Sequence, residues 1–246
     1  ETALKARPSI IVACGGDGTI NEVGTLLVDT PIKLGIIPFG SGNGLARALK
    51  IPKQTFSALN LIKAEHTKKI DVGLINQHCF FCNVSLGRTA KMVHYYNKNS
   101  KRGLTAYIQA IAKLLFKKAS PRTINLKINE KQTELKPDIF FISNSGLIGY
   151  NFSLTPEASL DDGQLHLLYT NKMSFTEKLL FIYSVVTKTQ LKTRKIHRTK
   201  FESLELLDTS KANFLIQIDG ESIFIKENKL IINIKKKALR VITPKL

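Results

Sequence analysis

Residues 10–19 read Ile-Ile-Val-Ala-Cys-Gly-Gly-Asp-Gly-Thr, and residues 38–47 read Pro-Phe-Gly-Ser-Gly-Asn-Gly-Leu-Ala-Arg. Each stretch contains a glycine-rich loop that follows a short apolar run, as is typical of a buried parallel strand. Apolar residues at helical spacing come after both loops, over 19–28 and 41–49, and a third helix is expected over 52–63. Strands alternating with helices predict a parallel sheet covered by helices.

From residue 70 onward the sequence changes to short apolar runs separated by turn residues, which predict a mostly antiparallel second domain. The expected strands are 71–75, 80–86, 124–128, 139–144, 165–169, 204–207, 215–218 and 230–234. Helical patterns at 105–116 and 175–186 interrupt them. The second helix opens with Ser174 and Glu177, which have the spacing of a capping box.

The position of the first strand bears on the completeness of the first domain. That strand begins at about residue 10, and a parallel sheet of two strands is not stable alone. We therefore expect the first domain to be truncated at its start.

Composition and charge limit the class of protein. Of the 246 residues, 43% are hydrophobic and 23% charged, which is typical of a globular protein. No apolar run approaches the roughly 18 residues of a membrane-spanning helix, and no signal peptide is evident. These features predict a soluble, cytoplasmic protein. The net charge of +18 favours a polyanionic partner, which can be nucleic acid, anionic membrane or a phosphate-rich substrate.

Three cysteines are too few and too unevenly spaced for a disulfide framework. Cys79 and Cys82 have the spacing of a zinc-binding pair, but two further ligands at comparable spacing are missing. Because they lie in a segment that reads as a strand, we interpret them as buried thiols.

The two glycine loops carry the chemistry of the chain. Free N–H groups at a helix start bind phosphate, and the carboxyl ends of neighbouring parallel strands meet at one edge of a sheet. Asp17 is unexpected in a loop that binds only anions, because its carboxylate repels phosphate unless a metal ion or a proton transfer involves it. The alternative is a tight turn with Asp17 as the helix N-cap.

Together, the segments 15–22 (GGDGTINE) and 38–49 (PFGSGNGLARAL) resemble the diacylglycerol kinase catalytic domain family. Three further segments agree: 70–73 (IDVG), 156–165 (PEASLDDGQL) and 218–221 (IDGE). The family includes bacterial diacylglycerol kinases, YegS/BmrU-like lipid kinases, and sphingosine and ceramide kinases. The resemblance implies an ATP-dependent lipid kinase.

The resemblance also implies the fold. It has an N-terminal Rossmann-like α/β domain and a C-terminal β-sandwich-like domain with helical inserts, as in NAD kinase and diacylglycerol kinase. The implied division is 1–70 plus 236–246 for the nucleotide-binding domain and 71–235 for the lipid-substrate domain, with ATP between them.

The family motifs assign roles to individual residues. Glu221 is the implied general base, although from the residues alone it also reads as a solvated turn residue. Asp17 is implied to organise Mg²⁺ and the phosphates, while in sphingosine-kinase-like relatives the equivalent Asp is the base. The implied ATP-binding residues are Gly15, Gly16, Asp17, Gly18, Thr19, Ile20, Asn21, Gly40, Ser41, Gly42 and Asn43. The implied structural Mg²⁺ ligands are the Asp162 side chain and the backbones of Ser159 and Gln164, with an Asp-capped glycine turn as the alternative.

The partners expected from this resemblance are ATP and a lipid at the surface of an anionic membrane, with peripheral association. Residues 188–200 hold six Lys or Arg and no acid, so they either dock on anionic headgroups or form a solvated loop. Nucleic acid is not expected, since no recognition motif accompanies the charge. A homodimer and the identity of the lipid are left open. The alternative functions are an NAD-kinase-like enzyme, which shares GGDGT, and a non-catalytic ATP- or lipid-binding module.

Overall fold

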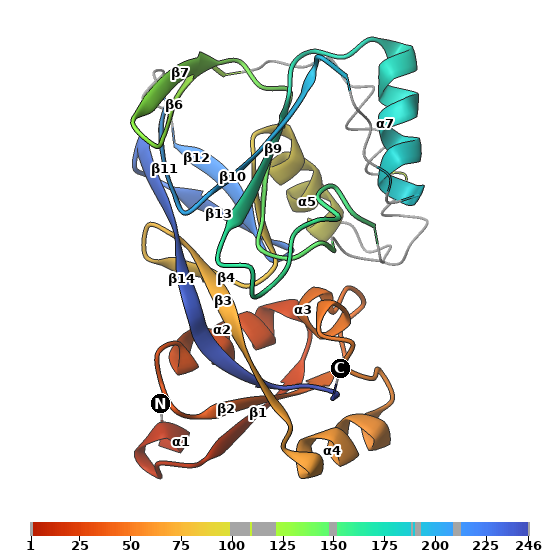
Figure 1. The fold of residues 1–246 in the computed structure, drawn as a ribbon, viewed down its shortest axis with the longest axis vertical. Helices are drawn as coiled ribbons and strands as arrows, with labels where there is room; N and C mark the ends of the chain where they lie inside the picture. Colours follow the sequence, from red (N-terminus) through yellow and green to blue (C-terminus); the bar gives the residue numbers. More distant parts are fainter. Residues whose placement is uncertain are drawn as a thin grey trace.

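The computed structural model describes residues 2–98, 109, 122–147, 152–187, 189, 193–208 and 213–245. Within these residues two β-sheets form the frame, one of eight strands and one of six. Figure 1 shows an α/β part below and a β-rich part above, joined by two long strands, β3 (Thr67–Ile75) and β14 (Lys229–Ile242). The predicted fold class, an α/β domain followed by a β-sandwich-like domain, is confirmed.

The lower part begins with a parallel pair of strands whose register places Ile10 opposite Lys33 and Gly15 opposite Pro38. Helices supply the crossovers that parallel strands require. The elements are α1 (Thr2–Lys5), β1 (Ile10–Gly15), α2 (Asp17–Leu27), β2 (Lys33–Pro38), α3 (Gly44–Ala48) and α4 (Thr55–Ala64). Two of the predicted helices begin three residues later than expected, at Gly44 instead of residue 41 and at Thr55 instead of 52, and the first begins at Asp17 instead of residue 19.

The upper part is built from antiparallel strands. In the six-stranded sheet the order is β10-β9-β8-β5-β12-β13, and the larger sheet adds β11, β6 and β7 beside β14. The elements are β3 (Thr67–Ile75), β4 (His78–Phe80), β5 (Asn83–Leu86), α5 (Arg88–Lys98), β6 (Ile124–Ile128), β7 (Lys131–Leu135), β8 (Ile139–Ser143), β9 (Leu165–Thr170), α7 (Phe175–Thr187), β10 (Ile196–Phe201), β11 (Ser203–Asp208), β12 (Phe214–Ile218), β13 (Glu221–Ile225) and β14 (Lys229–Ile242).

Strands β3 and β14 belong to both parts. The first half of β14 pairs with β11, and its last residues pair in parallel with β2, while β3 follows it throughout as an antiparallel partner. Their register shifts between Lys235 and Leu239. The expected domain boundaries, at 70/71 and 235/236, fall inside these two strands.

Among the described residues, three apolar cores hold the layers together. The largest lies between the two sheets of the upper part and includes Phe80, Ile142 and Leu167. A second lies in the lower part, where Ile20, Leu34 and Leu239 bring α2, β2 and β14 together. The third lies on the other face of the six-stranded sheet, where α7 packs through Phe181.

Several sequence-based expectations need correction. The single strand expected over 80–86 is two strands, interrupted at Phe81 and Cys82. Strands β7, β10 and β13 and helix α5 were not predicted, and residues 196–200 of the basic segment form β10 instead of a solvated loop. The helix expected at 105–116 lies outside the described residues.

Other expectations are confirmed. Helix α7 matches the prediction for 175–186, and its capping box forms: the Ser174 N–H donates to Glu177 and the Glu177 N–H donates to Ser174 Oγ. Cys79 and Cys82 are buried free thiols. In the part of the chain that the structure describes, no helix has the length and apolar character to cross a bilayer.

Candidate active site

The two glycine loops meet at the ends of β1 and β2. A Cβ built on Gly40 would lie 2.7 Å from the Cα of Gly16, so the two backbones touch. Both glycines have negative φ, which means that close approach and not backbone conformation requires them. The prediction that the loops share one edge of the sheet is confirmed.

Helix α2 starts at Asp17, and the residue before it, Gly16, supplies no side-chain cap. The N-cap alternative for Asp17 is therefore wrong. The first N–H groups of a helix have no partner within it, so those of residues 17–19 are suited to an anion. The Ile20 side chain is buried in the core and its N–H donates to the Gly16 carbonyl, so neither group is directed to a ligand. The Thr19 side chain lies against Gly15, where a Cβ would be 2.6 Å away.

The second loop is held in shape by its own polar groups. Asn43 has a left-handed backbone (φ 50°) and a buried side chain that accepts from the Gly40 N–H and donates to the Gly40 carbonyl. Arg47 Nε donates to the Gly42 carbonyl at 2.7 Å. Asn43 is thus a shaping residue of the loop, while Ser41 is exposed beside it.

Asp17 connects the two loops. Its Oδ1 accepts the Gly44 N–H at 2.6 Å, and a Cβ on Gly42 would lie 2.7 Å from its Oδ2. Burial raises the pKa of Asp17 from 3.8 to about 6, and the negative charge of Asp219 adds to this, while the Gly44 N–H opposes it. Such a carboxylate gains from a cation placed beside it.

Glu221 reaches the same place from the upper part of the molecule. It is the first residue of β13, directly after a turn in which Asp219 and Gly220 have positive φ (46° and 95°). A Cβ built on Gly18 would lie 2.0 Å from Glu221 Oε1, so the carboxylate rests on the first turn of α2. The structure therefore brings together Asp17, Gly18 and Glu221.

Asp219 is the residue that sequence reasoning missed as part of the site. Its buried carboxylate accepts the N–H groups of Phe81, Cys82 and Asn83 at 2.7–2.9 Å and Asn21 Nδ2 at 2.9 Å. Burial raises the pKa of Asp219, while these four donors favour the ionised form. Asn21 also donates to the Cys79 carbonyl, so its side chain joins α2 to the β-rich part. In the sequence, the Asp-Gly dipeptide at 219–220 indicates the turn that precedes Glu221.

The turn proposed for a structural Mg²⁺ is closed by its own hydrogen bonds. Asp162 accepts the Gln164 N–H at 3.1 Å and lies 2.8 Å from His166 Nε2, and the Ser159 hydroxyl donates to Asp161. Buried Asp71 accepts the N–H groups of Gly163 and of Lys237 in β14. Among the described residues no group of three or more His, Cys, Asp or Glu gathers around a metal position, so this site stays a prediction.

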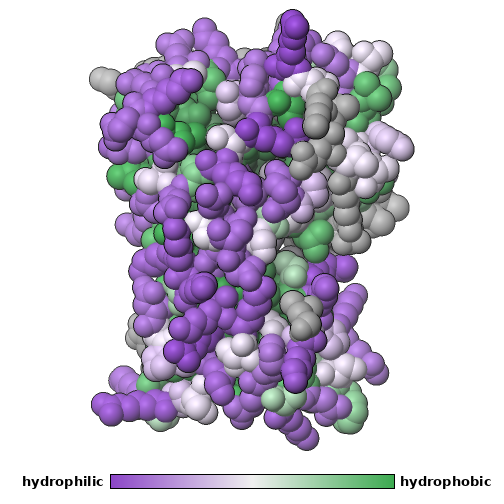
Figure 2. All heavy atoms as spheres, viewed as in Figure 1, coloured by the Kyte–Doolittle hydropathy of each residue, from purple (hydrophilic) through white to green (hydrophobic). Residues whose placement is uncertain are grey.

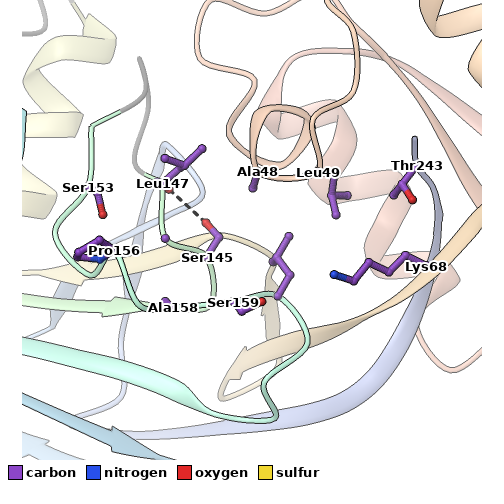
Figure 3. A pocket seen from close by; sticks show the side chains of 12 residues that line it. Ala48, Leu49, Lys68, Ser145, Leu147, Ser153, Pro156, Ala158, Ser159 and Thr243 are labelled. Carbon is purple, nitrogen blue, oxygen red and sulfur yellow. Dashed lines mark hydrogen bonds between the residues drawn. The ribbon is translucent and has the colours of Figure 1, made fainter. Parts of the chain in front are cut away.

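A cavity of about 230 Å³ lies beside the end of α3 (Figure 3). It is lined by the end of α3 at Ala48 and Leu49, by Lys68 and by segments 145–147 and 153–160. The side chains of Ser153 and Thr243 point into this region, and their buried hydroxyl groups have no partner among the described residues. Ser145 borders the cavity, and its N–H donates to Cys82.

Two family models match almost the whole chain. The diacylglycerol kinase catalytic domain matches residues 1–75, and the YegS C-terminal NAD kinase beta sandwich-like domain matches residues 82–243. This chain belongs to the diacylglycerol kinase family. The second match covers the β-rich part that supplies Asp219 and Glu221, and the first covers both glycine loops.

Relatives within the diacylglycerol kinase family agree. A diacylglycerol kinase of Staphylococcus haemolyticus is 32% identical over 228 residues, which cover 90% of this chain and 67% of that protein. One from Staphylococcus epidermidis is 30% identical over 90% of this chain and 70% of that protein. A crystal structure of a candidate diacylglycerol kinase from Bacillus anthracis superposes with a TM-score of 0.80 at 22% identity, over 98% of this chain and 79% of that one. At that identity the structure supports the fold alone.

Proposed function

We propose that the chain is the catalytic part of an ATP-dependent lipid kinase that transfers the γ-phosphoryl group to a lipid hydroxyl. The observation that carries the proposal is the position of the Glu221 carboxylate on the first turn of α2, whose N–H groups suit phosphate. A base beside a phosphate loop is what phosphoryl transfer to an alcohol requires. Membership of the diacylglycerol kinase family supports a lipid as the acceptor.

In the proposed reaction, the acceptor hydroxyl oxygen forms a bond to the γ-phosphorus, and the bond from that phosphorus to the β–γ bridging oxygen breaks. Glu221 takes the hydroxyl proton, and ADP leaves with the bridging oxygen. The loops around Gly16 and Gly40 hold the phosphates by backbone N–H groups, with Ser41 exposed next to them. Asp219 positions Glu221 by fixing the turn that precedes it.

Mg²⁺ would neutralise charge on the nucleotide phosphates. The residues fit this cation, because Asp17 is a largely buried acid whose ionisation is disfavoured by burial and by Asp219. Asp17 would hold it, with Gly44 orienting the carboxylate. We assign the base role to Glu221 and not to Asp17, because the Glu221 carboxylate rests on the first turn of α2. A second, structural Mg²⁺ at Asp162 with the backbones of Ser159 and Gln164 is part of the same proposal.

The acceptor is tested by offering labelled ATP and Mg²⁺ to the whole protein with diacylglycerol, monoacylglycerol, ceramide, sphingoid base, phosphatidylglycerol and NAD in parallel. Label in one lipid supports the proposal and names the substrate. Label in NAD alone assigns the chain to an NAD-kinase-like activity. ATP binding with no transfer to any acceptor indicates a binding module and contradicts the proposal.

A further inference from the structure

Helix α7 is apolar on its outer side as well as on the side that packs against the sheet. Phe181 and Ser184 face inward, and Phe181 joins the core formed by Phe141 and Leu168. The outer side chains are large, apolar and 46–65% exposed: Phe175, Leu179, Leu180, Tyr183 and Val186. In Figure 2, green atoms of hydrophobic residues reach the surface at the upper right, where α7 lies in Figure 1.

These side chains form one continuous stripe along the helix. At about 100° per residue, the outer positions 175, 179, 183 and 186 fall within roughly 80° of one another. Threonine is the only polar residue type on that side of the helix, and no charged residue interrupts the stripe. A contiguous stripe of large, exposed apolar side chains ordinarily has a second surface to cover it.

Basic residues border the stripe. Lys172 precedes the helix and Arg194 follows it, and both are exposed. On the adjacent strand β10, exposed Lys200 shares the face of Ile196, which lies in the core under α7, because side chains on a strand alternate between faces. Arg198 on the same face is half-buried and interacts with Glu157. The acid in the first turn, Glu177, is paired with Lys195 at 2.8 Å. The border of the stripe is therefore positively charged.

We propose that the outer face of α7 docks the protein on an anionic bilayer. The apolar stripe enters the boundary between headgroups and acyl chains, and the basic border contacts the lipid phosphates. A second copy of the chain is disfavoured as the occupant, because two chains of net charge +18 would bring like charges together. The proposal rests on the proposed function only in that a lipid kinase meets its acceptor at a membrane.

The test uses a pair of exposed apolar residues on each of two helices. Leu179 and Tyr183 on α7 are 46% and 65% exposed, while Leu59 and Phe56 on α4, at the opposite end of the molecule, are 42% and 70% exposed. Partition to vesicles of phosphatidylcholine and phosphatidylglycerol is measured for the whole protein. Leu179→Ser/Tyr183→Ser should weaken partition at least about tenfold, while Leu59→Ser/Phe56→Ser should leave it within about twofold.

A second variant, Lys172→Glu/Arg194→Glu, should weaken binding to anionic vesicles and leave binding to pure phosphatidylcholine unchanged, whether or not the serine variant folds. Equal partition of wild type and both α7 variants overturns the proposal. The proposal is also overturned if light scattering shows a dimeric wild type and a monomeric serine variant while both bind vesicles equally. That result would assign the outer face of α7 to a second copy of the chain.

Phosphoryl transfer to a short-chain acceptor dissolved without vesicles separates docking from catalysis. It should proceed at the wild-type rate in the α7 serine variant, and a loss there overturns the docking role. Failure of the wild type to phosphorylate any acceptor contradicts the proposed function, whereas docking is judged by the vesicle measurement alone.

Discussion

The carboxylate of Glu221, at the start of β13, lies directly on Gly18 in the first turn of α2, where a Cβ would be 2.0 Å from Oε1. The position of the Glu221 carboxylate therefore requires that residue 18 has no Cβ atom. Gly18→Ala should displace Glu221 and lower the turnover number at least about 100-fold. Alanine stabilises a helix by up to about 1 kcal/mol relative to glycine, so the midpoint of thermal unfolding should not fall.

Glu22→Ala is the control for this substitution, since Glu22 is an exposed residue of the same helix. Its turnover should match the wild type. Near-normal turnover of Gly18→Ala, measured with saturating ATP and lipid, would show that Glu221 does not need its position on Gly18.

Asp219 should be a determinant of stability as well as of the site. In Asp219→Asn one acceptor oxygen is replaced by an NH₂ group, which faces two donors: the N–H groups of Cys82 and Asn83 if it replaces Oδ1, or the Phe81 N–H and Asn21 Nδ2 if it replaces Oδ2. Hydrogen bonds to buried charged groups contribute about 1.5–3 kcal/mol each, so we expect a loss of about 2–4 kcal/mol in urea unfolding. Glu205→Gln, which breaks an exposed pair with Lys229, should cost less than about 1 kcal/mol. Equal losses would contradict the role of Asp219.

Asp17 should make the folded protein less stable as pH rises, which is opposite to the usual effect of a carboxyl group. Its pKa is about 6 in the folded protein against 3.8 for the free group, so the folded state retains the proton longer as pH rises. Ionising Asp17 therefore destabilises the fold progressively between pH 3.8 and 6, and the whole cost is present above pH 6. Asp17→Asn still accepts the Gly44 N–H but cannot ionise.

In EDTA, we expect Asp17→Asn to be more stable than wild type at pH 7.5, by less than about 3 kcal/mol because the group is partly exposed. The difference should shrink toward pH 4, as measured by urea unfolding at a series of pH values. Parallel pH profiles for the two proteins would show that Asp17 titrates as a free carboxyl group.

The turn at Asp162 offers a test of the structural metal. Mg²⁺ should raise the thermal midpoint of the wild type by mass action, and Asp162→Ala should abolish that rise. Asp161→Asn is the control, because Asp161 is paired with Lys68 and the Ser159 hydroxyl. If the rise is absent in the wild type, the turn is held by Gln164 and His166 without a metal.

The sequence predicted the elements whose signal is local. Apolar runs beside glycines located β1 and β2, and the Ser174–Glu177 spacing located the start of α7. The sequence does not indicate strand β10, because its Lys and Arg residues are also typical of a solvated loop and the strand is defined by its pairing with β9. Helix α5 was missed because its sequence has a low mean hydropathy.

The sequence could not predict the contacts at the site between segments that lie far apart in the chain. The run 80–86 reads as one strand, and it is interrupted because Asp219 takes the N–H groups of Phe81 and Cys82. The family motif marked Glu221, but the identity of Gly18 as its neighbour follows only from the joining of two domains by β3 and β14. Asn21 and Asn43 were expected at the nucleotide, and the structure uses both side chains to hold the site together.

The most direct test of the account is Glu221→Gln, with phosphoryl transfer and ATP binding measured on the same protein. Glutamine keeps the size of the side chain and its contact with Gly18 but cannot accept the hydroxyl proton. We expect transfer to the lipid to fall at least about 100-fold while the Kd for Mg²⁺-ATP, measured by calorimetry, changes less than about threefold. Turnover close to that of the wild type would contradict it and remove Glu221 from the mechanism.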